Sequence, residues 1–286
     1  MKRILVPIDF SAQSVNAFRF ALDIAGRSNG TITLLHVTTL PALHDSALLP
    51  AAGFKKALIR ELSEVAESKF KRIINKYNTE NIRIHTNVIT GRVHTGIIQF
   101  IQKENFDLVV MGTKGSSGLK EWMVGSNTEK MVRTSPVPVI AIKTYTPGMS
   151  IKRIIFPNSL DTENQEDLIM KIKGLQNFFQ ARLYIIWVNT PALSKPDHEI
   201  RRQLQRFADR FMLKDYTINV FNYTNEESGI LEFTTQTKGD MIAMGTHGLT
   251  GLAHLLAGSV AEDVVNHVLF PVWTYSAKSA KALTTR

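Results

Sequence analysis

Two copies of one glycine pattern stand 133 positions apart in this chain of 286 residues, and the pattern suits the binding of an anion. Each copy has the form G-x2-G-x9-G-S, with members Gly112, Gly115, Gly125 and Ser126 in the first and Gly245, Gly248, Gly258 and Ser259 in the second. A chain that turns sharply after a strand needs residues that tolerate positive φ, and the amides exposed in such a turn form a concavity for anions. Free N–H groups at the start of a following helix attract phosphate. The spacing therefore predicts two amide-rich elements that hold one polyphosphate between them.

A structural interpretation of the same residues stays open. Ser126 with Glu129, and Ser259 with Glu262, have the form of a capping box, in which the serine caps a helix and the glycines make turns. A glutamate in the first turn also repels an anion. The pattern is neither a P-loop nor the dinucleotide fingerprint. Local chemistry alone leaves a phosphate site and a turn followed by a helix cap equally open.

The residues around the glycines follow the periods of strands and helices. In the first half we expect strands at Lys2–Ile8, Thr31–Val37, Ile82–Ile89, Asp107–Met111 and Val137–Ile142. Helices are expected from Ser11 and at Phe54–Lys76, Gly96–Lys103 and Ser126–Thr134, with a loop at Thr38–Gly53. The second half repeats this order with strands at Lys152–Pro157, Arg182–Val188, Thr217–Tyr223, Asp240–Met244 and Phe270–Tyr275, and with helices at Ser228–Lys238 and Ser259–His267. Strands that alternate with helices imply a parallel sheet covered on both faces, which binds ligands beyond the carboxyl ends of its strands.

The repeat also predicts how the chain divides. The stretch Thr95–Thr134 returns without a gap at Ser228–His267. The segment 144–150 is typical of a linker, and Lys152–Pro157 then restarts the pattern of Lys2–Pro7. We therefore predict two similar α/β domains, at residues 1–146 and 151–278.

Composition limits the classes of function. Residues 1–150 carry 19 Lys and Arg against 11 Asp and Glu, whereas residues 151–286 carry 15 against 14, so an anionic ligand is favoured in the first half. The basic residues are mostly scattered singly over predicted helices, which is typical of a solvated face and makes nucleic acid a minor alternative. The chain has no cysteine, which excludes disulfides, thiolate metal sites and cysteine nucleophiles. Its beginning lacks a secretory signal, and no apolar run is long enough to span a bilayer, so we expect a cytoplasmic protein without a membrane partner.

The first predicted strand ends in an aspartate, Asp9, and the glycine pattern follows the fourth strand of each half. In these features the chain resembles the universal stress protein family, as a tandem member with two domains. The resemblance implies an open five-stranded parallel sheet of order 3-2-1-4-5 in each domain, of the adenine nucleotide alpha hydrolase-like fold. It also implies antiparallel pairing of the last strands, Val137–Ile142 with Val272–Tyr275, about a pseudo-twofold axis. Members of the nucleotide-binding branch hold ATP at the glycine motif, so the resemblance implies ATP, with Mg²⁺, as the cofactor.

Carried over to this sequence, the resemblance implies a complete nucleotide site in the first half. Asp9 would accept hydrogen bonds from both ribose hydroxyls, and such charge-assisted bonds are strong. The other implied residues are Pro7 and Ile8 beside the nucleoside, Val37 and Met111 near the adenine, and Gly112, Gly115, Gly125, Ser126, Asn127 and Thr128 around the phosphates. A turn role for Asp9 ahead of Ser11 stays open, and local preference alone favours it.

The second half departs from this pattern. Ser159 takes the place of Asp9 in the register of the first strand, and Trp187 and Val188 stand where His36 and Val37 stand. The second glycine motif is intact, so its members Gly245, Gly248, Gly258 and Ser259 remain candidates. We predict weak or no ATP binding there, with the glycines kept mainly for the fold.

The sequence thus predicts a stress-response regulator that binds ATP or a related adenine nucleotide in its first half and so alters its contacts with an unidentified regulatory protein. Two alternatives stay open, an interaction module that binds no nucleotide and a slow ATP hydrolase. Neither a Ser-His-Asp set nor paired carboxylates can be argued, and His247 and His254 lack a carboxylate partner, so we predict no catalytic residue and no metal ligand. The tandem repeat predicts an intramolecular pseudo-dimer and leaves a further homodimer open.

Overall fold

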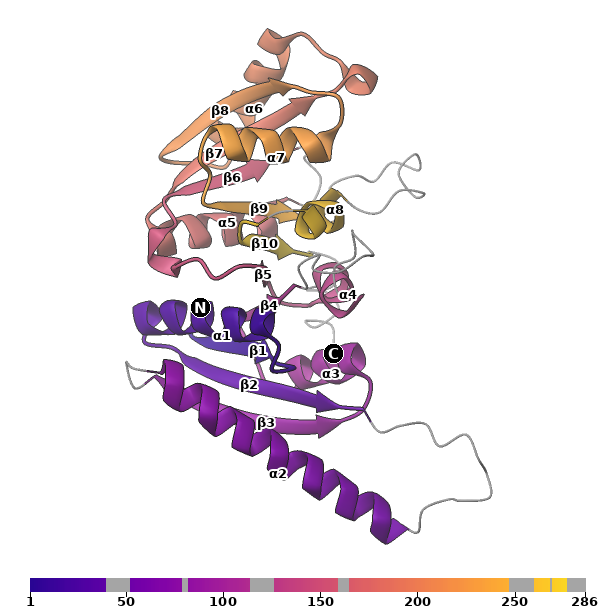
Figure 1. Ribbon diagram of the computed structural model, residues 1–286. Helices are drawn as coiled ribbons and strands as arrows, with labels where there is room; N and C mark the ends of the chain where they lie inside the picture. The colour runs from indigo at the N-terminus through magenta and orange to yellow at the C-terminus, as the bar shows by residue number, and fades with distance from the viewer. Residues whose placement is uncertain are drawn as a thin grey trace.

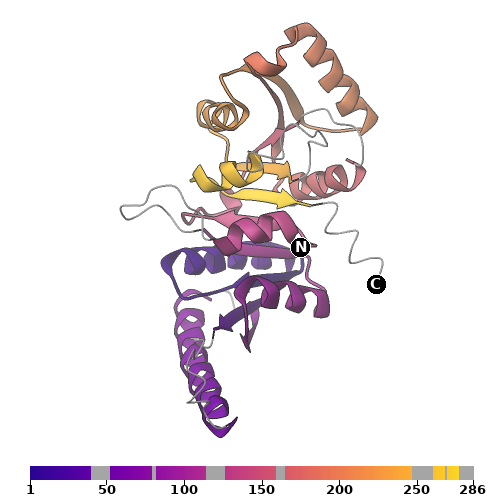
Figure 2. The same ribbon diagram turned by 90° about the vertical axis from the view of Figure 1, so that its right-hand side faces the viewer.

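The chain forms one continuous ten-stranded sheet with helices on both sides (Figures 1 and 2). The computed structural model describes residues 1–39, 52–78, 82–113, 126–158, 165–246, 260–267 and 269–276. The strand order is β3-β2-β1-β4-β5-β10-β9-β6-β7-β8, so each half has the order 3-2-1-4-5. This confirms the predicted fold class and strand order.

The elements of the first half lie close to the predicted ranges. Its strands are β1 (Arg3–Pro7), β2 (Thr31–Thr38), β3 (Arg83–Thr90), β4 (Leu108–Gly112) and β5 (Val139–Ile142). Its helices are α1 (Ala12–Ser28), α2 (Ala52–Tyr77), α3 (Val93–Lys103) and α4 (Ser126–Thr134). Helix α3 begins three residues before the predicted Gly96, because the chain turns into it directly after Gly91 ends β3.

The second half repeats the first, with a shorter connection after its second strand. Its strands are β6 (Arg153–Pro157), β7 (Arg182–Asn189), β8 (Tyr216–Asn222), β9 (Met241–Gly245) and β10 (Val272–Tyr275). Its helices are α5 (Glu166–Phe179), α6 (Asp197–Arg210), α7 (Glu226–Gln236) and α8 (Val260–His267). Two 3₁₀ turns complete the described elements, η1 (Gly148–Ser150) and η2 (Pro191–Leu193).

Two apolar cores lie on opposite faces of the sheet. One is built with α1, α2, α5 and α6 and holds Phe18, Phe70 and Phe156. The other is built with α3, α4, α7 and α8 and holds Ile97, Met131 and Ile230. Because successive side chains of a strand point to opposite faces, strands that are buried on both sides become continuous apolar runs.

The two halves meet along an antiparallel pair of strands. Val272, Trp273 and Thr274 of β10 pair with Ala141, Ile140 and Val139 of β5. This confirms the pairing that the family resemblance implied. All other strand pairs of the sheet are parallel.

The segment between the halves is fixed to the first of them. Asp23 of α1 accepts a hydrogen bond from the amide of Gly148 at 2.7 Å and from the hydroxyl of Tyr145 at 3.3 Å. The guanidinium of Arg19 lies 3.7 Å from the centroid of the Tyr145 ring. The predicted linker is therefore docked on α1, while the predicted domain limits at residues 146 and 151 stay a prediction.

An aspartate ties the first strand of each half to its fourth. Asp107 accepts hydrogen bonds from the amides of Lys2 and Arg3 at 2.7 and 3.0 Å. Asp240 stands 133 positions later and accepts from the amides of Lys152 and Arg153 at 3.0 and 2.8 Å. Each carboxylate thus satisfies backbone groups where a strand begins.

Among the described residues, no helix has both the length and the apolar character to cross a membrane.

Candidate functional site

The candidate site of the first half lies where the strand order reverses. Strands β1 and β4 are parallel neighbours, with Ile4 opposite Leu108, although five elements separate them in sequence. Loops that leave two such strands diverge, and ligands of open α/β sheets bind in the resulting crevice. Asp9 follows β1 here and Gly112 ends β4. The topology therefore brings the predicted ribose anchor and the first motif glycine to the same edge of the sheet.

The position of Asp9 is compatible with both roles that the sequence left open, a turn residue before α1 and a hydrogen-bond acceptor for a ligand. Its Oδ1 accepts a hydrogen bond from the Ser11 amide at 3.0 Å, and the Ser11 hydroxyl in turn caps α1 by accepting from the Ser14 amide at 3.2 Å. The residue is nevertheless exposed to solvent. Partial burial raises the pKa of Asp9, but hydrogen bonds from Ser11 and Ser14 outweigh it and hold the pKa below its ordinary value. The carboxylate is therefore ionised at neutral pH and able to accept further hydrogen bonds.

The residue after Asp9 is one that sequence reasoning did not single out. Phe10 has a φ of 65°, a left-handed conformation that is an outlier for a bulky side chain. Its ring centroid lies 4.9 Å from that of His36 and 5.3 Å from that of Phe70, and the ammonium of Lys69 lies 5.1 Å from it. Strained backbone persists where the surroundings over-determine it, and it concentrates at functional sites. The aromatic contacts hold the turn that carries Asp9.

Gly112 has a structural reason to be glycine. A Cβ built there would collide with backbone atoms of α1, namely the carbonyl carbon of Gln13, the Gln13 oxygen at 2.5 Å and the Ser14 nitrogen at 2.5 Å. The end of β4 thus lies directly against the first turn of α1. The sequence offered two reasons for this glycine, a turn and an anion, and the structure adds a third, the close approach of two backbones.

The start of α4 is tied to the same point. The Thr128 hydroxyl is buried and donates to the Gly112 carbonyl at 3.1 Å, while Asn127 is half-buried beside it. Helix α4 begins at Ser126, and the capping-box interpretation of this serine stays a prediction. The first amides of a helix have no partner within the helix, and here they lie at the edge that carries Asp9. Gly115, Gly125 and the side chain of Ser126 lie outside what the structure describes.

The apolar residues implied for the nucleoside lie on two faces. Met111 and the half-buried Val37 pack in the core beneath α3 and α4. Ile8 packs in the opposite core, and its amide donates to the Leu35 carbonyl at 2.9 Å. Pro7 ends β1 and is buried. The structure thus places Val37 and Met111 on one face of the sheet, on strands that flank β1, and the side chain of Ile8 on the other face.

Backbone bonds fix the register of the second half. The Asn158 amide donates to the Ile186 carbonyl at 3.0 Å, as the Ile8 amide does to Leu35. Asn158 therefore corresponds to Ile8, and the next residue, Ser159, to Asp9. A Cβ on Gly245 would meet only the flexible end of Leu168, at 2.9 Å, in place of backbone. Gly248, Gly258 and Ser259 lie outside the described residues. Within the described part of the chain, no cluster of three or more metal-ligating side chains occurs.

Comparison with known proteins gives the family. The model of the universal stress protein family matches residues 1–143 and 220–276. The chain belongs to the universal stress protein family. A universal stress protein of Methanocaldococcus jannaschii is 28% identical over 142 residues, which are 50% of this chain and 82% of that protein. A universal stress protein of Synechocystis is 20% identical over 297 residues, covering 96% of this chain and 100% of its own.

Solved structures of the family share the whole arrangement. A universal stress protein from Archaeoglobus fulgidus superimposes with a TM-score of 0.74 at 22% identity, over 96% of this chain and 98% of that one. Another from Pseudomonas aeruginosa gives 0.64 at 19% identity, over 100% and 97%. At these identities the likeness shows the fold, and this universal stress protein has the tandem form of it.

Proposed function

We propose that this protein is a regulator in the stress response whose first half binds ATP or a related adenine nucleotide. The observation that carries the proposal is Asp9, an exposed and ionised carboxylate beside the strand reversal, at the same edge as Gly112 and the start of α4. A carboxylate accepts from two vicinal hydroxyls, and free helix amides suit phosphate. Val37 and Met111 belong to one apolar cluster on the same face of the sheet, and they would supply apolar surroundings for a base.

The residues of the first half fit the nucleotide chemically. Within the described part of the chain, the buried hydroxyl of Thr113, the residue after Gly112, has no hydrogen-bond partner. One end of the site thus offers a carboxylate for hydroxyls and the other offers amides and a hydroxyl for phosphate oxygens. Bound nucleotide would supply negative charge to the more basic half of the chain, and Mg²⁺ would accompany the phosphates.

Calorimetric titration of the full chain with ATP tests this proposal. We expect binding at one site per chain, weakened more than tenfold by Asp9→Ala, since a hydrogen bond to a charged group contributes about 1.5–3 kcal/mol. The matched control is Asp161→Ala, which removes the acidic residue two positions after Ser159 in the second half. Equal weakening by both variants, or two equivalent sites in the wild type, would contradict an ATP site confined to the first half.

A second candidate function is an interaction module that binds no nucleotide. It is favoured by the observation that Gly112 and Thr128 already have structural roles, one in contact with α1 and the other in a bond to β4. Purified protein that carries no nucleotide and gives no heat with ATP, ADP or AMP would establish this alternative.

A further inference from the structure

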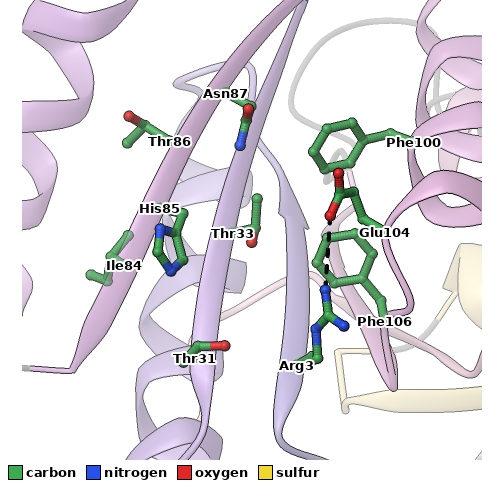
Figure 3. A pocket seen from close by; sticks show the side chains of 10 residues that line it. All are labelled: Arg3, Thr31, Thr33, Ile84, His85, Thr86, Asn87, Phe100, Glu104 and Phe106. Carbon is green, nitrogen blue, oxygen red and sulfur yellow. Dashed lines mark ion pairs between the residues drawn. The ribbon is translucent and has the colours of Figure 1, made fainter.

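A hollow opens on the first half, away from the edge that carries Asp9. It has a volume of about 670 Å³ and lies beside α3, over the amino-terminal parts of β1, β2 and β3 (Figure 3). Side chains of Thr31, Thr33, His85 and Asn87 form its floor on the sheet. Arg3 and Glu104 face each other along one side, next to Phe106.

The floor consists of polar side chains that are open to solvent: His85 is exposed, and Thr31, Thr33 and Asn87 are half-buried. Thr31 and Thr33 point to the same face of β2 as Leu35, which is fully buried. On β3, His85 pairs with Thr33 and Asn87 pairs with Leu35. Within the described part of the chain, none of the four polar side chains makes a hydrogen bond. Helix α3 covers the sheet further along, through Ile97 and Ile101. The polar side chains at the amino-terminal parts of β2 and β3 thus lie beyond the part of the sheet that α3 covers.

Arg3 and Glu104, at one side of the hollow, carry opposite charges and form only a long ion pair. The Arg3 guanidinium lies 3.9 Å from a Glu104 oxygen, and the two side chains are 48% and 43% exposed. Arg3 also lies 5.8 Å from the centroid of the Phe106 ring. An exposed pair at this distance contributes little to stability, so both groups remain available to a ligand.

The second half shows what the same face becomes when its polar groups are satisfied. Asn219 has the sheet position of Asn87, because their partners Ile186 and Leu35 pair with Pro157 and Pro7. The amide of Asn219 donates to the Ile185 carbonyl and to the Thr217 hydroxyl, both at 3.1 Å.

Two further positions of this face also differ between the halves, at the counterparts of Arg3 and of Thr33. Arg153, the counterpart of Arg3, donates twice to Asp240, at 3.3 and 3.2 Å. Tyr184 stands at the place of Thr33, opposite Thr217 as Thr33 stands opposite His85. The fold therefore accepts a filled and internally bonded version of this face, and the first half has an open one.

We propose that this hollow binds a small neutral polyhydroxylated ring, of the size and class of a monosaccharide or cyclic polyol. Each hydroxyl of such a ring both donates and accepts, which matches the threonine hydroxyls, the Asn87 amide and the His85 imidazole. Arg3 and Glu104 supply one strong donor group and one strong acceptor group while the lining stays neutral, so an anion gains no net attraction. The volume lies within the range of small-molecule sites. The inference is independent of nucleotide binding.

Saturation-transfer NMR on the full chain tests the inference with D-glucose, D-ribose, myo-inositol and glycerol as probes, and with inorganic phosphate and glycine for comparison. We expect saturable millimolar binding of at least one ring polyol. Thr33→Tyr, which places in the hollow the residue that the second half carries, weakens it at least tenfold. The matched variant Tyr184→Thr leaves the binding unchanged, and so does Asp9→Ala, which separates this site from the nucleotide site.

Asn87→Leu provides a second variant with the same expected loss, and thermal unfolding establishes that each variant is folded. The proposal is overturned if none of the four polyols binds saturably, if binding survives both Thr33→Tyr and Asn87→Leu, or if phosphate binds in the hollow more tightly than every polyol.

Discussion

At the scale of single residues, the two halves use the same positions for different purposes. Gly112 and Gly245 occupy the same place in the repeated motif. Gly112 lies against the backbone of α1, at Gln13 and Ser14, whereas Gly245 lies against the side chain of Leu168. The sequence predicts that both positions are glycine turns, because the spacing is visible in it. The contact with Gln13 is not visible, since it depends on where α1 begins relative to β4 in space.

Replacement of the two glycines by alanine should therefore have unequal effects. We expect Gly112→Ala to lower the free energy of unfolding by about 1–3 kcal/mol or more, because the added carbon meets backbone that cannot move aside without shifting α1. Gly245→Ala meets the end of the Leu168 side chain, which can rotate, so the loss should be smaller. Urea unfolding of both variants measures the difference. An equal loss for the two, or a larger one for Gly245→Ala, would contradict this account.

At the scale of elements, the repeat predicted the strands and helices because each is a local pattern of apolar residues. Helix α4 occupies the predicted range Ser126–Thr134, and β2 extends one residue beyond the predicted Val37. The hydrogen bonds from backbone amides to Asp107 and Asp240 were not predicted, although the two aspartates are also 133 positions apart. Each partner lies about a hundred residues earlier in the chain, so no local pattern indicates it. Phe10 escaped for another reason, since a positive φ at a bulky residue runs against its own local preference.

The connection between the halves carries a prediction at this scale. Asp23→Ala removes the acceptor of the Gly148 amide and of the Tyr145 hydroxyl, so we expect residues 144–150 to detach from α1. The free energy of unfolding should fall by about 1–3 kcal/mol, and the Gly148 amide should exchange with solvent much faster. Hydrogen exchange followed by mass spectrometry measures the second effect.

Asp209→Ala is the matched control for the loss of a helical carboxylate. Asp209 lies on α6, and among the described residues its side chain accepts a hydrogen bond only from the exposed Gln205, at 2.8 Å. Its removal should change stability by less than about 0.5 kcal/mol and leave the exchange of residues 144–150 as it was. Unchanged exchange in Asp23→Ala would show that the connection is held by other contacts.

At the scale of the whole molecule, the two halves are joined through their cores as well as through the chain. Trp273 of β10 is 1% exposed and belongs to the same buried cluster as Ile4, Ile140 and Ile154, which come from both halves. The parallel order of each half follows from alternating strands and helices in the sequence. The antiparallel joint between β5 and β10 came from the family resemblance alone, since no local pattern states which edges meet.

This joint predicts a single cooperative unfolding transition. Trp273→Ala leaves a large cavity beside the pair β5–β10, so we expect a loss of about 3–5 kcal/mol and a separation of the transition into two steps. Calorimetry together with fluorescence and circular dichroism distinguishes one step from two. A wild-type protein that already unfolds in two separate steps would show that the shared sheet does not couple its halves.

The covalent joining of two pseudo-symmetric halves also has an evolutionary consequence. In a symmetric homodimer every mutation is copied into both subunits, so one site cannot lose a function while the other retains it. Here Asp9 and Ser159, or Thr33 and Tyr184, are encoded separately and can be selected separately. Each molecule then contains one copy of each version in a fixed ratio, whatever the level of expression.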